Sequence, residues 1–224
     1  NNLISFNKHN TQNKIPRIID DLHSGKSIAL VSDAGMPSIC DPGEELVKDA
    51  KSHGINIVCI PGPCAALTAL VSSGLPSSKF VFEGFLPKKK ALREKNLLEI
   101  SKYEKTTIIY ESPHRLKKLL AELKEYCGGD REIEVSRELT KKFEEHIGDQ
   151  IDNVINFFEG KEVLGEITVV IKGIDKTKQK CEFDQADLKK ELNALINAGL
   201  SLSAAAKYLA KKNNLTKNLI YNMY

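Results

Sequence analysis

Three short segments hold groups that could bind a polar ligand or move a proton. In SDAGMPSICDPG (residues 32–43), small residues and prolines would bring backbone amides close to a ligand, and Asp33 would accept hydrogen bonds. In PGPCAA (residues 61–66), a helix N-terminus could receive a ligand's polar groups. YESPHR (residues 110–115) places a carboxylate, an imidazole and a guanidinium close together. These groups suit ligand binding and general acid–base catalysis.

Each segment also has a purely structural interpretation. Asp41 could cap the helix that follows it, and Ser112 could do the same for the next helix along. A tight connection from strand to helix needs glycine and proline, so residues 61–63 leave a turn and a binding site equally open. For residues 33–38 we favour a ligand loop, because the run of small residues is longer than a turn requires.

The common nucleotide-binding and hydrolase motifs are absent from the sequence. It contains no G-x-G-x-x-G, G-x-x-x-x-G-K-[ST], G-x-S-x-G or H-E-x-x-H. A cofactor would therefore not bind through the usual glycine-rich Rossmann loop. The five cysteines form no C-x-x-C pair and have no histidine cluster beside them, so we expect no metal site. Cys40, Cys59 and Cys127 are expected to be buried, reduced thiols.

Apolar periodicity predicts the elements that would position these segments. Short apolar runs predict strands at residues 27–31, 55–60, 79–82, 106–110, 133–135 and 167–171. Amphipathic patterns predict helices at residues 16–23, 43–53, 65–73, 91–103 and 114–126. The alternation of strand and helix indicates β-α-β units and a largely parallel sheet with helices on both faces. The three segments then follow strand ends, where such sheets bind ligands.

A separate helical unit is predicted near the C-terminus. After Gly173 comes a polar, lysine-rich stretch at residues 175–180, followed by helical patterns at residues 191–197, 203–211 and 216–221. Gly199 would end the first helix, and Ser201 or Ser203 would cap the next. The unit has the size of a helix-turn-helix.

Composition and charge narrow the class of protein. The 224 residues are 41% hydrophobic and 28% charged, as in an ordinary globular protein. The sequence has no apolar run near the roughly 18 residues of a membrane span, and residues 1–13 lack the apolar part of a signal peptide. We therefore expect a cytoplasmic protein.

Binding to nucleic acid would depend on clustered lysines, because the net charge is only +3. One cluster could hold phosphates and comprises Lys88, Lys89, Lys90, Arg93 and Lys95. A second basic face could come from Lys207, Lys211, Lys212 and Lys217. In both places, lysines that only keep the surface soluble are the alternative.

Six motifs, taken in order, carry a resemblance to a known family. They are SDAGMPSICDPG (32–43), PGPCAALTALVSSGLP (61–76), FEGFLPKKKALRE (82–94), YESPHRL (110–116), SRELTKKFEE (136–145) and GEITVVI (165–171). With them, most of residues 5–171 resembles the tetrapyrrole methylase superfamily. FEGFLPKK, ESPHR and RELTK are similar to its 16S rRNA (cytidine 2′-O) ribose methyltransferases in particular.

The resemblance implies an α/β fold with two lobes. A mostly parallel first sheet would lie in residues 1–76 and a mixed second sheet in residues 77–174, followed by a small helical C-terminal domain in residues 182–224. The cofactor S-adenosyl-L-methionine (SAM) would fold into the cleft between the lobes, usually in a homodimer. Members of the family begin with a strand and a Thr-Pro-x-Gly-Asn-type loop that this sequence does not show. We therefore expect an incomplete first lobe, and calorimetry should find weak or undetectable SAM binding by these 224 residues alone.

The resemblance also implies site residues. Those expected to contact SAM are Asp33, Ala34, Gly35, Pro37, Ser38, Cys64, Ala65, Tyr110, Glu111, Gly165, Glu166 and Ile167. Cys64 stands where relatives often have serine, a change of similar size. Candidates for activating a ribose 2′-hydroxyl or stabilising its oxyanion are Glu111, His114, Arg115, Arg137, Glu138, Lys141 and Lys142. Imidazole titrates closest to neutral pH, which favours His114, while Arg137 or Lys141 could act electrostatically. The residues alone leave this choice open.

The substrate implied by the resemblance is a cytidine in the decoding region of 16S rRNA or of the small ribosomal subunit. Lys88, Lys89, Lys90 and Arg93 would bind its phosphates. Methyl transfer of this kind needs no metal. Two other interpretations remain: a tetrapyrrole-type methylase acting on a small molecule, and a non-catalytic RNA-binding protein on the same scaffold.

Overall fold

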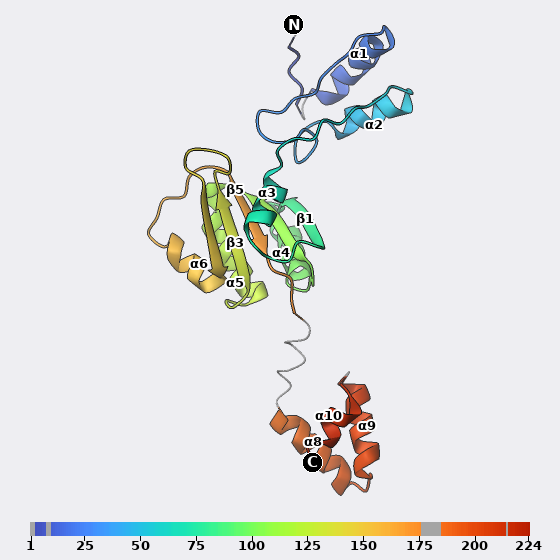
Figure 1. The fold of residues 1–224 in the computed structure, drawn as a ribbon, viewed down its shortest axis with the longest axis vertical. Coiled ribbons are helices and arrows are strands. Elements are labelled where there is room, and N and C mark those ends of the chain that lie inside the picture. Colours follow the sequence, from blue (N-terminus) through green and yellow to red (C-terminus); the bar gives the residue numbers. More distant parts are fainter. Residues whose placement is uncertain (1–2, 8–9, 176–184, 214) are drawn as a thin grey trace. The chain divides into compact units, whose positions relative to one another are not determined.

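The chain forms two units, and its structure is known here from a computed structural model (Figure 1). The residues described are 3–7, 10–175, 185–213 and 215–224. The first unit is Asn1–Gly173 and the second is Ile174–Tyr224. Among the described residues, none of the helices combines the length and the apolar character of a membrane span.

A five-stranded mixed sheet forms the centre of the first unit. Its strands are β1 (Phe80–Phe85), β2 (Thr106–Glu111), β3 (Glu132–Arg137), β4 (Glu145–Gln150) and β5 (Ile167–Ile171). Their order across the sheet is β1-β2-β5-β3-β4. The β1–β2 pair is parallel, and the other three pairs are antiparallel. The mixed sheet implied by the resemblance is therefore confirmed. The largely parallel sheet inferred from the alternation is wrong here, because β5 runs back between β2 and β3.

Three helices cover one face of this sheet: α4 (Lys90–Ile100), α5 (Pro113–Cys127) and α6 (Ile151–Phe158). α5 shows why they do so. Its four buried leucines repeat at helical spacing and are at most 1% exposed: Leu116, Leu119, Leu120 and Leu123. Burying each such side chain contributes about 1.5–3 kcal/mol. This apolar stripe fixes α5 on the sheet and thereby fixes the site residues at its N-terminus.

The opposite face is covered by α3 (Ala65–Ser72). Small residues at Ala66 and Ala69 let this helix approach Ile108 of β2 and Val170 of β5. β2 and β5 are thus buried on both faces, which explains their nearly continuous apolar sequences.

The remaining two helices of the first unit pack against each other. They are α1 (Thr11–His23) and α2 (Glu44–Ser52), with Ile15, Ile18, Ile19, Leu46 and Ala50 between them.

The strands predicted at residues 27–31 and 55–60 do not form. Both segments lack regular secondary structure, and Val31 and Ile60 are 76% and 75% exposed. A strand needs a neighbour to pair its backbone N–H and C=O groups, and the described residues place no strand beside either segment. The mostly parallel first sheet is therefore absent from the described part of the chain.

The cysteines also differ from expectation. Cys40 and Cys59 are exposed, and Cys127 is only half-buried. Cys59 lies in one of the segments that forms no strand, so it is not enclosed by a sheet and its helices. Cys181 lies outside the described residues.

The second unit is a small helical core. It contains α8 (Gln185–Asn197), α9 (Leu202–Lys212) and α10 (Lys217–Tyr221). Gly199, with φ +97°, follows the first of these helices. The Ser201 hydroxyl then caps α9 by accepting a hydrogen bond from the Ala204 amide at 3.3 Å. The core comprises Leu188, Leu192, Ala205, Ala206, Leu209, Ala210 and Ile220.

Candidate functional site

Strand register brings several predicted site residues to one edge of the sheet. Glu111 at the end of β2 pairs with Ile167 at the start of β5, and Ile167 pairs with Arg137 at the end of β3. Tyr110, residues 165–166 and residues 138–141 adjoin this row. The edge where these three strands meet is the candidate site.

Glu111 is a buried carboxylate on the face of the sheet that α4 and α5 cover. It is 2% exposed. One carboxylate oxygen, Oε1, lies 2.5 Å from an Arg115 guanidinium nitrogen and accepts a hydrogen bond from the Ser112 amide at 2.8 Å. The other, Oε2, lies 3.5 Å from Arg93. Because both oxygens are engaged, the structure favours a positioning role for Glu111 over that of a base.

The position of Arg93 contradicts its predicted role in binding RNA. It is only 5% exposed, and besides Glu111 it contacts Glu122 at 2.7 Å. A buried guanidinium between two carboxylates cannot bind a phosphate of RNA at the surface, so its prediction as an RNA-binding residue is wrong. Its helical spacing turns it inward from the exposed Lys88, Lys89 and Lys90. Arg115 likewise turns toward Glu111.

Tyr110 points to the opposite face and ties the second loop to the sheet. Its hydroxyl accepts a hydrogen bond from the Ala66 amide at 3.0 Å. Its ring packs edge-on against Phe82 and Phe85, with centroids 4.9 and 5.7 Å away. Burial, with the Cys64 thiol beside it, raises the pKa of Tyr110 to about 12. The predicted residues Cys64, Ala65 and Tyr110 are thus brought together.

The first loop lies against both the second loop and β1. A Cβ built on Gly35 would lie 3.7 Å from the Pro63 carbonyl oxygen. A Cβ built on Gly84 would lie 3.0 Å from the Cys40 sulfur. The loops of residues 32–43 and 61–66 therefore meet, as a shared ligand site requires.

The first loop is also conformationally constrained. Ser38 and Cys40 have φ +69° and +63°, a region that side chains other than glycine rarely adopt and that is often found at ligand sites. Asp41 accepts a hydrogen bond from the Ser32 hydroxyl and does not cap α2. The predicted SAM contacts in this loop are either exposed (Asp33, Ala34, Gly35) or half-buried (Pro37, Ser38).

A second charged cluster joins the loops after β3 and before β5. The Lys141 ammonium lies 2.9 Å from carboxylate oxygens of both Glu138 and Glu166. Glu138 also accepts a hydrogen bond from the Glu166 amide at 2.9 Å. Hydrogen bonds to Glu138 and Glu166 raise the pKa of Lys141, and the bond from Lys141 lowers the pKa of Glu138. Lys141 is therefore held as a cation and is unsuited to acting as a base.

The other predicted residues near this edge have separate positions. Arg137 bonds Glu145 at 3.0 Å and the Leu164 carbonyl at 3.3 Å. His114 is exposed in the first turn of α5. Ile167 is buried between β2 and β3 and is 4% exposed. Within the described ranges, no group of three acidic, histidine or cysteine side chains is placed to hold a metal ion.

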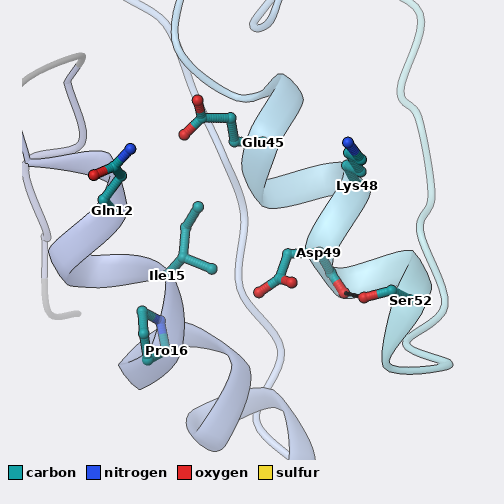
Figure 2. A pocket seen from close by; sticks show the side chains of 7 residues that line it. All are labelled: Gln12, Ile15, Pro16, Glu45, Lys48, Asp49 and Ser52. Carbon is teal, nitrogen blue, oxygen red and sulfur yellow. Dashed lines mark hydrogen bonds between the residues drawn. The ribbon is translucent and has the colours of Figure 1, made fainter.

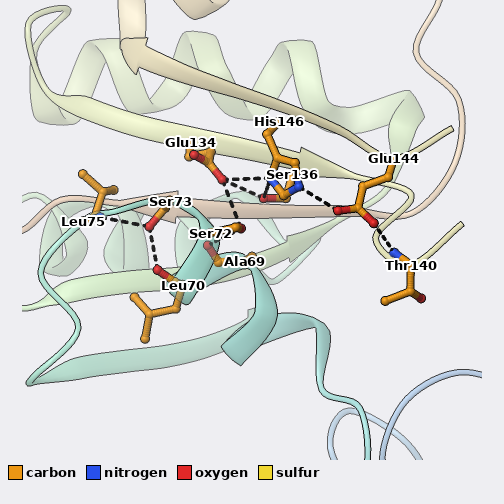
Figure 3. A network of polar contacts seen from close by, with 10 residues as sticks. All are labelled: Ala69, Leu70, Ser72, Ser73, Leu75, Glu134, Ser136, Thr140, Glu144 and His146. Carbon is orange, nitrogen blue, oxygen red and sulfur yellow. Dashed lines mark hydrogen bonds and ion pairs between the residues drawn. The ribbon is translucent and has the colours of Figure 1, made fainter.

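Sequence reasoning missed a polar network on the α3 face of β3 and β4 (Figure 3). Glu134, whose side chain is 9% exposed, lies 3.1 Å from Nδ1 of His146 and accepts a hydrogen bond from Ser136 at 3.0 Å. The other ring nitrogen, Nε2, lies 2.9 Å from Glu144. Glu144 in turn accepts a hydrogen bond from the Thr140 amide at 2.6 Å. The signal in the sequence was the alternation of Glu134 and Ser136 with apolar residues in β3.

His146 should make stability depend on pH. Hydrogen bonds to Glu144 and then Glu134 raise its pKa above the ordinary value of 6.5. A raised folded-state pKa gives a contribution that is complete below 6.5 and is lost as pH rises through the folded-state value. Replacing His146 by glutamine should therefore cost more stability at pH 6 than at pH 9, by at most about 1 kcal/mol for this partly exposed group. Urea unfolding of both proteins at the two pH values measures it; equal differences would contradict the prediction.

A groove of about 450 Å³ lies elsewhere, between α1 and α2 (Figure 2). It is lined by Gln12, Ile15, Pro16, Glu45, Lys48, Asp49 and Ser52. None of these is a predicted site residue, and the groove is open to solvent. It is not part of the candidate site.

The fold is shared with solved structures of other proteins. The chain superposes on the methyltransferase CobJ with a TM-score of 0.55 at 19% identity, covering 72% of this chain and 70% of that one. The superposition on diphthine synthase has a TM-score of 0.55 at 18% identity and covers 75% of this chain and 68% of that one. The family described as Tetrapyrrole (Corrin/Porphyrin) Methylases matches residues 5–154. The sheet, its helices and the loops at its edge thus define a tetrapyrrole methylase fold.

Similar sequences narrow the family further. The chain is 42% identical to "Ribosomal RNA small subunit methyltransferase I" of Bacillus subtilis, covering 99% of this chain and 77% of that protein. It is 41% identical to the protein of the same name from Vibrio cholerae, covering 97% and 75%. The chain belongs to the tetrapyrrole methylase family and, within it, to the family of these relatives. The family predicted from the motifs is confirmed.

Proposed function

We propose that the chain is a SAM-dependent methyltransferase that methylates the ribose 2′-hydroxyl of a cytidine in 16S rRNA of the small ribosomal subunit. The observation that carries the proposal is the 38–42% identity, over nearly the whole chain, to relatives named for small-subunit rRNA methylation. The sequence motifs of this chain also contain the residues that lie together at the edge of the sheet. A homodimer in the cytoplasm is part of the same proposal, and sedimentation would test the dimer.

The loops at the edge of the sheet fit the chemistry of SAM. The Cys64 side chain does not cap α3, so amides of its first turn other than that of Ala66, which donates to Tyr110, could receive a carboxylate. The exposed Asp33 offers acceptors to amino or hydroxyl groups. Gly35 and Pro63 bring the two loop backbones together. When bound, SAM supplies an electrophilic methyl group on a sulfonium.

The chain's own residues would act on the ribose hydroxyl, which is a poor nucleophile until its proton begins to leave. Lys141, held as a cation between two carboxylates, would stabilise the developing oxyanion. His114, exposed at the start of α5, is the candidate proton acceptor. Lys88, Lys89 and Lys90, which are exposed before and at the start of α4, would hold phosphates of the RNA.

Tritium transfer from labelled SAM tests the proposal. The full-length protein should label small-subunit RNA and should not label a porphyrinoid, and the label should map to a cytidine ribose. Transfer to the porphyrinoid would indicate a small-molecule methylase, and RNA binding without transfer would indicate a non-catalytic protein. Variants His114→Ala and Lys141→Ala should each be slow; if both methylate at the wild-type rate, the assigned roles are wrong.

A further inference from the structure

The loop between β3 and β4, residues 138–144, holds an unusual backbone conformation. Glu138 and Thr140 have φ +52° and +66°. Neither is a glycine, and residues with side chains hold this conformation only where the surroundings over-determine it. Strained positions of this kind gather at ligand clamps and active sites. The conformation of this loop therefore suggests a role beyond connecting two strands.

Two sets of charged contacts hold this conformation. At the start of the loop, Lys141 binds Glu138 and Glu166, each at 2.9 Å. At its end, Glu144 accepts the Thr140 amide at 2.6 Å and lies 2.9 Å from His146, which reaches the buried Glu134 (Figure 3). The loop is thus anchored on one side to Glu166, just before β5, and on the other to the strands of its own hairpin.

This anchored loop presents an aromatic ring and a cation to solvent. Phe143 is 64% exposed, and the Lys142 ammonium lies 5.5 Å from the centre of its ring. The carboxylates of Glu138 and Glu145 pair with Lys141 and Arg137, and that of Glu144 lies beside the His146 ring. Lys142 has no carboxylate within 4 Å among the residues the structure describes. The outward face of the loop therefore carries an exposed aromatic ring and, beside it, the ammonium of Lys142.

An exposed ring beside a lysine suits an unpaired nucleobase and its phosphate. Proteins bind single-stranded RNA by stacking bases on aromatic side chains and pairing phosphates with cations. One ring and one ammonium offer far less area than a stable protein interface buries. We propose that Phe143 stacks on an unpaired base of the RNA substrate while Lys142 contacts an adjacent phosphate. The inference rests on the proposed RNA substrate and adds a contact next to Lys141.

The test compares two exposed phenylalanines that each have a lysine nearby. Phe157 in α6 is 36% exposed, and the Lys161 ammonium lies 3.3 Å from its ring centre. In the full-length protein, Phe143→Leu should weaken binding of a fluorescent single-stranded oligoribonucleotide about tenfold and raise KM for small subunits similarly, with kcat within about twofold. Phe143→Trp should bind nearly as the wild type does, and Phe157→Leu should change neither value. Lys142→Gln should reduce the slope of log Kd against log salt by an amount that corresponds to about one phosphate contact.

Several results would overturn this inference. They are equal RNA affinity for Phe143→Leu and Phe157→Leu, failure of Phe143→Trp to restore binding, and a changed sedimentation coefficient for Phe143→Leu, which would indicate an interface between copies. Methyl transfer keeps the two proposals separate. Weakened RNA binding in Phe143→Leu, with no transfer by the wild type, would reject the enzyme and keep the contact. Transfer with an unchanged KM in Phe143→Leu would reject only the contact.

Discussion

Replacing Glu111 by alanine should lower the free energy of unfolding by about 3–5 kcal/mol, because it removes one of the two carboxylate partners of the buried Arg93 and breaks the ion pair with Arg115. The Arg93 side chain is 6% exposed and would keep Glu122, whereas the Arg115 side chain is 27% exposed and would lose its ion pair with Glu111. The Ser112 amide would also lose its acceptor. Urea unfolding followed by circular dichroism measures the loss, with an unchanged m-value showing that the same transition is observed.

The control for Glu111 is an acidic residue on the surface of the same region. Glu94 lies 3.7 Å from Lys90 and its side chain is 47% exposed, so Glu94→Gln should change stability by less than about 0.5 kcal/mol. Glu111→Gln keeps the shape of the side chain and should still lose more stability than Glu94→Gln does. Equal small losses in all three variants would show that the network around Glu111 is solvated, contrary to its burial.

Gly165→Ala should be the most damaging single-atom change at the candidate site. The added Cβ would lie 2.4 Å from Cγ and 2.5 Å from Cδ of Glu138, and the backbone has φ +88°. Glu138 would have to leave, which breaks its bonds to Lys141 and to the Glu166 amide. We expect a loss of about 3 kcal/mol, combining backbone strain with these hydrogen bonds, and a fall of at least tenfold in methyl transfer.

Gly160→Ala separates backbone strain from the contact with Glu138. Gly160 has φ +69°, and a Cβ there would meet nothing within 4 Å. The free energy of unfolding of this variant should fall by only about 1–2 kcal/mol, and its methyl-transfer rate should be unchanged. Both variants can be compared by urea unfolding and by tritium transfer. If they lose the same stability and the same activity, the cluster of Glu138, Lys141 and Glu166 does not depend on Gly165.

The sequence predicted the buried centre of the fold better than its periphery. β2, β5 and α5 stand out because burial on a sheet face leaves an apolar pattern that local reading detects. β4 was not predicted, because it is an edge strand with the polar sequence EHIGDQ. α6 is only eight residues long and follows it directly. Pairing direction was also hidden, since the antiparallel insertion of β5 is set by tertiary contacts.

The candidate site shows the same division. Motifs identified most of the residues that strand register gathers at one edge, including Tyr110, Arg137 and Gly165. They could not show that Arg93 turns inward, because a lysine-rich run looks exposed until the helix face is known. Nor could they reveal His146, whose partners Glu134 and Glu144 are brought to it by hairpin pairing and by the loop. Side-chain direction and long-range pairing are the missing information in both cases.

β5 joins two parts of the sheet that do not otherwise pair. β1 and β2 bond to each other, as do β3 and β4, and β5 alone connects β2 with β3. A two-stranded piece is at best marginally stable in water, and an open strand edge can template aggregation. During synthesis, the chain must therefore carry two incomplete pieces with uncovered edges until Ile167–Ile171 has emerged. Insertion of this last strand is the step at which the first unit can fold cooperatively.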